Sequence, residues 1–256
     1  MRKLWLGLLT GGVMFTAFAN PSTIILISDP NVLAIPISDI KEPWVDLSQH
    51  KTIVYGPSPE IPNNKDYTWL RTTVYEKLMM AQNKLPKGLH FCLYEGYRSI
   101  AVQKMIFEKQ LSNVKKRHPD WPAEQLFLET TKLVSPVVNP DQSPNIPPHS
   151  TGAAIDVYLL DDQGNAIDMG IHPKDWMNDA DGVLSLTMSD HISPLAQKNR
   201  RIMSDALNAV GFVNYPTEYW HWSYGDRYWA YVTQQPRAFY GSYIPQHIRA
   251  REPLDH

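Results

Sequence analysis

Hydrophobic and polar positions along this chain follow two regular periods. Apolar residues three or four positions apart between Leu70 and Leu85 predict a helix, and alternation between Leu89 and Tyr94 predicts a half-buried strand. The same patterns predict further helices at 100–114, 122–133 and 195–210 and further strands at 153–160, 212–215 and 219–224. Because helices come first and strands dominate the centre, we expect an α+β fold in which helices pack on a central antiparallel sheet.

The N-terminus has a different pattern. Met1–Lys3 is positively charged, residues 4–15 are apolar, and Ala17–Ala19 has the small-residue spacing of a cleavage site. These features predict a secretory signal peptide over residues 1–19. An anchor that stays uncleaved is the alternative, but the apolar run is shorter than the roughly 20 residues that cross a bilayer. We therefore expect a periplasmic or secreted protein without stable membrane insertion after cleavage.

The rest of the chain is expected to form one domain, because its length allows one full core and its composition does not divide it. We assign residues 20–50 to an irregular entry segment, 51–243 to the folded domain and 244–256 to a C-terminal tail. The aromatic residues of 228–243 are expected to pack against the strand at 219–224, with a lip over a cleft as the alternative. The sequence indicates no oligomeric state.

Charge and cysteine content argue against two classes of site. The formal net charge is −2 and no long basic run occurs, which argues against nucleic acid as the main partner, since phosphate binding depends on clustered Lys and Arg. The basic triplet Lys115–Arg117 is interpreted as a solvated helix face. Cys92 is the only cysteine, so no internal disulfide can form and any transition metal must be held by His and carboxylate ligands.

Two short segments carry the residues that point to chemistry. His149 and Asp156 lie at the two ends of the first, and Gly152 between them permits a sharp backbone turn. Glu218 and His221 lie in the second. Two imidazoles and one carboxylate form a normal shell for a catalytic zinc ion, with a fourth position open for a water that a nearby glutamate can deprotonate. Regular alternation would place Glu218 and His221 on opposite faces of a strand, so we expect Glu218 at or before the strand's start.

These segments resemble those of a known family. The pattern His-x-x-Gly-x-Ala-x-Asp, followed about sixty residues later by Glu-x-x-His with aromatic neighbours, is similar to that of the VanX-type D-alanyl-D-alanine dipeptidases. These enzymes belong to a zinc peptidase superfamily that also contains D,D-carboxypeptidases. Glu95–Ser99, Asp168–Gly170 and Asn199–Phe212 match further parts of the family pattern, so the resemblance extends over residues 54–224.

The resemblance implies a zinc-dependent enzyme that hydrolyses the D-alanyl-D-alanine dipeptide in the cell envelope. It implies that one zinc ion per chain is bound by His149, Asp156 and His221, and that Glu218 is the catalytic base. It also implies that Arg98 polarises the scissile carbonyl and stabilises the oxyanion, in accord with the large effect of a fixed cation on developing negative charge. A purely structural ion pair is the alternative for Arg98.

The family binds the free amine of its substrate through a carboxylate that follows the Met-Gly turn. Asp175 is the best positional match, although the turn is longer here by about one residue. Asp179, Asp181 and a plain solvated acidic loop are the alternatives. Pro147–Pro148 occupies the place of a family serine, which leaves the exact peptide preference open.

Two other functions remain as alternatives. A peptidoglycan D,D-carboxypeptidase or endopeptidase of the same superfamily would need the amine end of the cleft to be open to a longer peptide. A zinc-stabilised binding module without catalysis would need neither Glu218 nor Arg98, and the presence of both argues against it. The predicted signal peptide favours turnover of wall-derived dipeptide over antibiotic resistance, because an exported enzyme cannot easily reach the cytoplasmic precursor pool.

Overall fold

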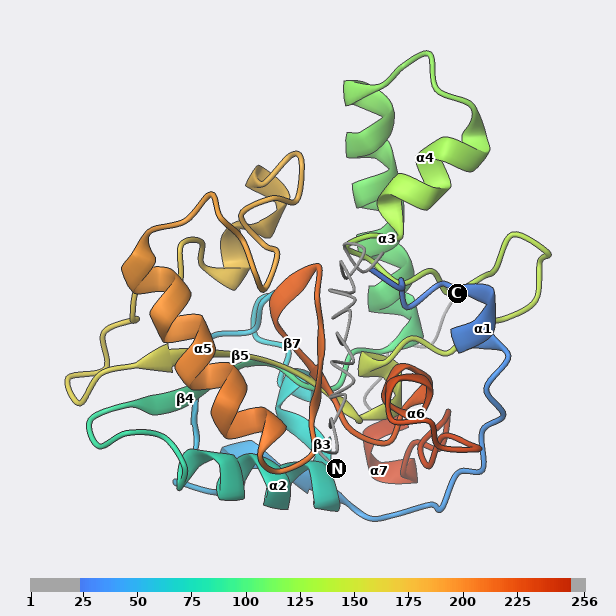
Figure 1. The fold of residues 1–256 in the computed structure, drawn as a ribbon. Helices are drawn as coiled ribbons and strands as arrows, with labels where there is room; N and C mark the ends of the chain where they lie inside the picture. The colour runs from blue at the N-terminus through green and yellow to red at the C-terminus, as the bar shows by residue number, and fades with distance from the viewer. Residues whose placement is uncertain (1–23, 250–256) are drawn as a thin grey trace, which may run out of the picture.

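The centre of the molecule is a five-stranded sheet. The computed structural model describes residues 24–249, and the signal peptide predicted for residues 1–19 lies outside this part of the chain. The strand order is β2–β4–β5–β7–β6 (Figure 1). The strands are β2 (Val54–Tyr55), β4 (His90–Glu95), β5 (Ala154–Leu160), β6 (Val213–Tyr215) and β7 (Glu218–Ser223).

The pairing of these strands is mainly antiparallel. Only the edge pair β2–β4 is parallel within this sheet, whereas β4–β5, β5–β7 and β7–β6 are antiparallel. The chain leaves β2 and returns to β4 through the helix α2 (Thr72–Gln82) rather than through a hairpin, and such a crossover permits parallel pairing. The expected α+β fold with a central sheet is therefore confirmed, with the parallel edge pair as a correction.

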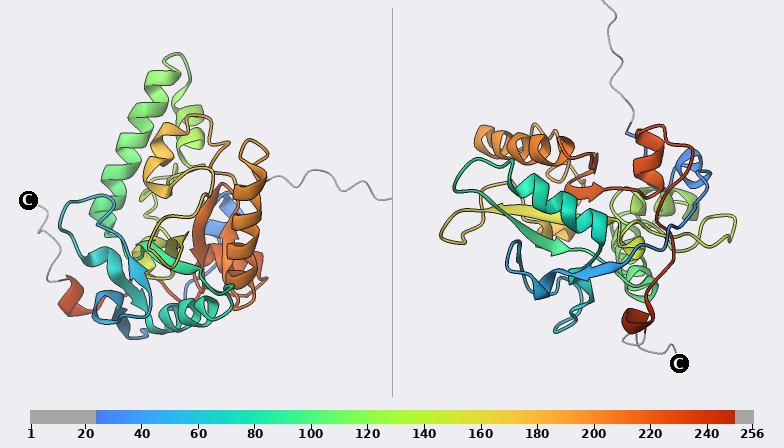
Figure 2. Two further views of the ribbon diagram at one scale, coloured as in Figure 1. Left: turned by 90° about the vertical axis from the view of Figure 1, so that its left-hand side faces the viewer. Right: turned by 90° about the horizontal axis from the view of Figure 1, so that it is seen from below.

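Two helices cover one face of this sheet. In the three views, α2 and α5 (Pro194–Asn208) lie on the same side of β4 and β5 (Figures 1 and 2). Their buried residues share one core cluster with the residues of β5 that point to the same face; these residues are Val74, Leu78, Met203, Leu207, Ile155, Val157 and Leu159. The apolar periodicity near residue 70 thus marks the buried side of α2. Because Ile155 and Val157 take the core side, strand alternation turns Asp156 to the other side.

A helical hairpin projects beyond the sheet. It consists of α3 (Ile100–Arg117) and α4 (Ala123–Thr130) (Figures 1 and 2). The rings of Phe107 and Phe127 lie 5.5 Å apart and join the two helices. The hydroxyl of Ser99 accepts a hydrogen bond of 3.3 Å from the Val102 N–H and caps the start of α3. The base of α3 thereby comes next to the end of β4.

The two ends of the described chain pack around the sheet. The N-terminal part contains α1 (Pro30–Leu33), β1 (Trp44–Asp46), the 3₁₀ turns η1 (Leu47–Gln49) and η2 (Asp66–Thr68), and β3 (Trp69–Arg71), which pairs with β1. The C-terminal part contains α6 (Arg227–Val232) and α7 (Gln246–Arg249). The ring of Trp229 lies 4.9 Å from that of Tyr224, and Tyr240 joins the main core, which confirms the predicted packing of the aromatic segment. Within residues 24–249, the helices are too short or too polar to cross a membrane.

Candidate metal and catalytic site

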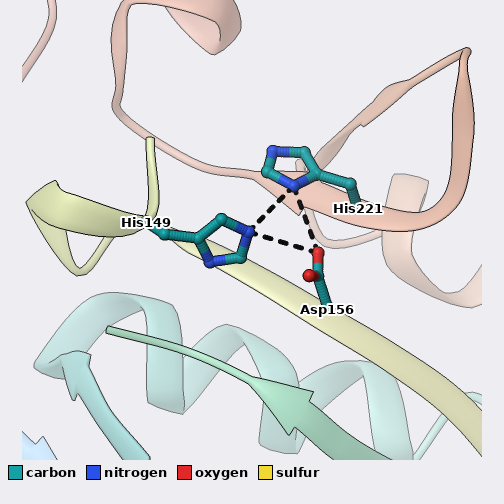
Figure 3. Close-up of side chains that lie close together, drawn as sticks. All are labelled: His149, Asp156 and His221. Atoms are coloured by element: carbon teal, nitrogen blue, oxygen red, sulfur yellow. Dashed lines mark hydrogen bonds and ion pairs between the residues drawn. The ribbon is translucent and has the colours of Figure 1, made fainter. Parts of the chain in front are cut away.

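Three side chains from separate segments converge on one point. His149, Asp156 and His221 direct their ligand atoms toward one another (Figure 3). His149 Nε2 lies 3.1 Å from His221 Nδ1, and Asp156 Oδ1 lies 3.3 Å from the first nitrogen and 3.1 Å from the second. Three ligand atoms on a tetrahedral zinc ion are about 3.3 Å from one another, given bonds of about 2.0–2.1 Å. The spacing of this buried triangle therefore fits such an ion.

Pairing of the central strands places two of these residues. Asp156 on β5 is directly opposite His221 on β7, so both side chains leave the sheet on the same face. Their neighbours Ile155 and Trp222 are also paired, and these two residues enter the core on the other face. Removal of the large apolar neighbours from water thus fixes the orientation of both polar side chains.

His149 comes from a loop instead of a strand. It begins the 3₁₀ turn η3 (His149–Thr151), which Gly152 ends in the left-handed region at φ 71°. A Cβ atom at Gly152 would lie 2.6 Å from the ring of Trp44, so a larger residue does not fit without movement. The turn is held further by Arg71, whose Nε donates to the Thr151 carbonyl at 2.8 Å.

A backbone carbonyl fixes the orientation of the His149 ring. His149 Nδ1 donates a hydrogen bond of 2.8 Å to the Gly96 carbonyl, which is only an acceptor. In the neutral ring, Nε2 is then an unprotonated acceptor that faces His221 and Asp156. Burial opposes ionisation of Asp156, but the positive charge that His149 and His221 carry when protonated, together with their hydrogen bonds, outweighs it and holds the pKa of this carboxyl below its usual range. An electron-rich cluster of this kind suits a divalent cation.

Glu218 lies beside the three residues. It is the first residue of β7, as the sequence leads one to expect, and it lines the same cleft as His149, Asp156 and His221. Pairing of β6 with β7 shifts register between Asn214 and Tyr215, which breaks the alternation that would separate Glu218 from His221. Glu218 Oε2 accepts a hydrogen bond of 2.9 Å from the indole of Trp220.

The surroundings of Glu218 favour proton transfer. The pKa of Glu218 is raised well above its usual value, mainly by burial and next by the nearby Asp156 carboxylate. His149 and Arg98 act in the opposite direction. A carboxylate with a raised pKa is a stronger base than an exposed one. The group is therefore suited to accept a proton from water and to return it to a departing amine.

Arg98 both faces the cleft and forms an ion pair, which are the two roles that the sequence leaves open. Its guanidinium lines the cleft, and it also forms an ion pair with Glu95, to which Nε donates at 2.9 Å. Nη1 donates to the side chain of Gln103 at 2.9 Å. Burial alone would lower the pKa of Arg98, but Glu95 raises it, so the arginine is held charged and in a fixed orientation. Glu95 and Gln103 were not assigned a role from the sequence, although Glu95 lies in the Glu95–Ser99 motif.

Asp175 is not among the residues that line this cleft. It lies in η4 (Pro173–Asn178), where its N–H donates to the His172 carbonyl, and the cleft wall is formed by its neighbour Trp176 instead. Asp179 is buried and accepts a hydrogen bond from the Ser185 N–H at 2.7 Å, and Asp181 lines a separate surface cavity. Of the described residues that line the cleft, Glu60, Tyr94 and Trp176 have no signal in the sequence that links them to the motif residues.

Comparison with known proteins gives a family match. The model of the family described as D-ala-D-ala dipeptidase matches residues 66–241, a range that contains Arg98, His149, Asp156, Glu218 and His221. A D-alanyl-D-alanine dipeptidase of Synechocystis is 27% identical in an alignment of 232 residues that covers 79% of this chain and 90% of the relative. A protein of the same name from Escherichia coli is 36% identical over 134 residues, which are 52% of this chain and 54% of the relative.

Two solved structures also show a weak likeness. The LD-carboxypeptidase LdcB has a TM-score of 0.37 and 18% identity, over 75% of this chain and 73% of that chain. The vancomycin resistance D,D-pentapeptidase VanY, solved as a mutant in complex with Zn(II), has a TM-score of 0.33 and 16% identity, over 81% of this chain and 96% of that chain.

Proposed function

We propose that this chain, which is a peptidase and belongs to the D-ala-D-ala dipeptidase family, hydrolyses free D-alanyl-D-alanine to D-alanine with one bound zinc ion. Two relatives named D-alanyl-D-alanine dipeptidase support the choice of substrate. The observation that carries the proposal is the convergence of His149, Asp156 and His221 with Glu218 and Arg98 in one cleft.

The proposed roles follow from the chemistry of the residues. His149, Asp156 and His221 would hold the zinc ion, which supplies Lewis acidity that makes water a nucleophile near neutral pH. Glu218 takes a proton from the water while the oxygen of that water attacks the scissile carbonyl carbon. The same group gives this proton to the nitrogen when the C–N bond breaks, which releases two molecules of D-alanine.

Arg98 stabilises the negative charge that develops on the carbonyl oxygen. Its guanidinium is held by Glu95 and Gln103, and the donors that these contacts leave free are available to the substrate. Because the orientation exists before the substrate binds, no reorganisation is needed during the reaction. Loss of one such donor typically lowers kcat by about 10²- to 10³-fold.

The walls of the cleft support a small substrate. Two large aromatic side chains, those of Trp176 and Trp220, form part of its wall. A free dipeptide fits this description better than a folded protein or a cross-linked wall strand.

We also propose that the enzyme acts in the periplasm or outside the cell. The predicted signal peptide supports this location, and D-alanine released there would come from wall-derived dipeptide. The N-terminal sequence of the protein recovered from the periplasmic or secreted fraction tests the location. A mature N-terminus near Asn20 is expected, and an intact Met1 in the cytoplasm would contradict it.

The function is tested by D-alanine release from the purified, zinc-loaded protein. Free D-Ala-D-Ala and a stem pentapeptide ending in the same pair are the two substrates, and Glu218→Gln is the inactive control. The proposal predicts release from the free dipeptide and little from the pentapeptide. Preference for the pentapeptide would instead indicate a D,D-carboxypeptidase, and no release from either by the zinc-loaded protein would indicate a non-catalytic module or another substrate.

A further inference from the structure

Glu60 is an acidic residue of the cleft that the mechanism does not use. It comes from the segment between β2 and η2, which lies outside every motif found in the sequence. Its side chain is partly buried and lines the same cleft as Arg98, Asp156 and Glu218. The fold therefore brings a fourth acidic side chain, besides Glu95, Asp156 and Glu218, to the neighbourhood of the proposed reaction centre.

Each of the other three carboxylates has a partner. Glu95 is paired with Arg98, Asp156 with the two histidines, and Glu218 accepts from the indole of Trp220. Glu60, in contrast, forms no hydrogen bond or ion pair that the structure shows within residues 24–249. Of the acidic groups in this cleft, Glu60 is thus the one left free to bind a ligand.

The electrostatic surroundings of Glu60 favour a cation. The pKa of this carboxyl is raised above its usual value, mainly by burial and further by the nearby Glu95 carboxylate. Arg98 and Lys109 act in the opposite direction, but among the described residues no ion pair joins either of them to Glu60. A ligand ammonium group at this position would relieve the repulsion between the carboxylates and would gain a charge-assisted hydrogen bond.

The proposed substrate carries such a group. Free D-alanyl-D-alanine has an α-ammonium group on the residue that contributes the scissile carbonyl, and this group distinguishes the dipeptide from the end of a longer stem peptide. The position expected from the sequence for its recognition, Asp175, does not line the cleft, whereas Glu60 does. We propose that Glu60 binds the α-ammonium group of the substrate and selects short peptides with a free amino terminus. This inference rests on the proposed dipeptidase function.

Binding measurements separate this inference from the function itself. The zinc-loaded Glu218→Gln protein, which is expected to bind but not to hydrolyse, is titrated calorimetrically with D-Ala-D-Ala and with N-acetyl-D-Ala-D-Ala. Adding Glu60→Gln should weaken binding of the free dipeptide by roughly 10- to 100-fold, the usual effect of losing a hydrogen bond to a charged group. Binding of the acetylated peptide should not weaken, because it has no ammonium group to lose.

Kinetics of the protein with an intact Glu218 give a second readout. Glu60→Gln should raise KM for the free dipeptide and leave kcat within a few-fold, because the ammonium contact is made in both the ground state and the transition state. The matched control is Glu124→Gln, the same chemical change at an exposed position of α4. Zinc content and thermal midpoint are measured for both variants, to show that the effect is not one of folding or of metal loss.

The outcomes distinguish the two proposals. Failure of the protein to release D-alanine would count against the dipeptidase function, whatever the binding results. Equal affinity of the Glu60→Gln variant and its parent for the free dipeptide would overturn the role of Glu60, even in an active enzyme. That role is also overturned if neither peptide binds, if both peptides lose affinity equally, or if Asp175→Asn rather than Glu60→Gln produces the amine-specific loss.

Discussion

Asp156 and His221 are opposite each other on β5 and β7, with Asp156 Oδ1 3.1 Å from His221 Nδ1. A backbone pairing therefore sets the distance between two of the three proposed zinc ligands, and only His149 depends on a loop. The strands bury Ile155 and Trp222 on the core side, so a slip of one residue would turn the two polar side chains into the apolar core and the apolar ones toward the cleft. The stability of the core thereby maintains the geometry of the site.

Substitution of either histidine should abolish metal binding. His149→Ala and His221→Ala each remove one of three ligands, and the remaining pair cannot complete a zinc shell. Elemental analysis after dialysis should give about one zinc ion per chain for the unmodified protein and less than about a tenth of that for each variant. His191→Ala is the control, because His191 is exposed and its ring pairs with the adjacent Asp190. Stoichiometric zinc in the His149 or His221 variant would remove that residue from the ligand set.

Glu218→Gln should separate metal binding from turnover. The amide keeps the size of the side chain and its contact with the Trp220 indole, but it cannot accept a proton from water. We expect full zinc content and a fall in kcat of about 10²- to 10⁴-fold. The measurement is D-alanine release at saturating dipeptide beside elemental analysis of the same sample. Turnover at the rate of the unmodified enzyme would rule out Glu218 as the base.

Arg98→Lys should impair catalysis more than folding. Lysine keeps the charge but loses the fork that binds Glu95 and Gln103, so the cation is no longer held beside the substrate. We expect kcat/KM to fall by about 10²- to 10³-fold with a near-normal zinc content. If Arg98 served only as a structural ion pair, the thermal midpoint would fall while kcat of the folded fraction stayed unchanged.

Gly152→Ala should destabilise the turn that carries His149. The substitution combines a positive φ with a contact of 2.6 Å between the new Cβ and the Trp44 ring, for an expected loss of about 3 kcal/mol in the free energy of unfolding. Gly164→Ala is the matched control, because Gly164 has a similar φ of 80° but no heavy atom within 4 Å of the added Cβ. It should lose only about 1 kcal/mol. Equal losses in urea unfolding of the two variants would show that the Trp44 contact has no effect.

Asp39→Asn should reduce stability in a pH-dependent way. Asp39 binds Arg71, whose Nη2 donates at 3.0 Å and whose Nε holds the Thr151 carbonyl beside His149. Burial opposes ionisation, but the Lys41 N–H, the Arg71 charge and the Gly241 N–H together lower the pKa of Asp39 below 3.8. Loss of this charged contact should lower the free energy of unfolding by about 2 kcal/mol near neutral pH.

The sign of the pH effect follows from the lowered pKa. The ionised Asp39 contributes stability above the unfolded-state value near 3.8, and this contribution is lost as the pH falls through the lower folded-state value. The difference in stability between the unmodified protein and Asp39→Asn should therefore be constant above about pH 5 and should shrink below about pH 4. A difference that grows on acidification would contradict this account of the pair.

The regular part of the fold could be predicted from the sequence because burial imposes a period. The alternating strand at 153–160 and the helix at 195–210 match β5 (Ala154–Leu160) and α5 (Pro194–Asn208) within about two residues. Both are long enough for the apolar period to be clear. The short β1 and the six-residue α6 were not predicted, because a few residues carry no measurable period and their order depends on the tertiary contacts around them.

Some residues of the candidate site could likewise be predicted from the sequence, and others could not. His149, Asp156, Glu218 and His221 are linked by fixed spacings within two segments, so the sequence alone predicts that they act together. Glu60 lies in an irregular segment with no such spacing, and only the tertiary structure brings it to the cleft. Asp175 was selected by its position after a turn, and in the structure its neighbour Trp176 lines the cleft.

The central claim is that hydrolysis depends on one metal ion bound at His149, Asp156 and His221. The most direct measurement is a zinc titration of the chelator-treated protein, with D-alanine release from D-Ala-D-Ala as the readout. We predict that the metal-free protein is inactive and that activity rises in proportion to added zinc until about one equivalent per chain is bound. Release of D-alanine at the full rate by the metal-free protein, or no release at any zinc loading, would contradict the account.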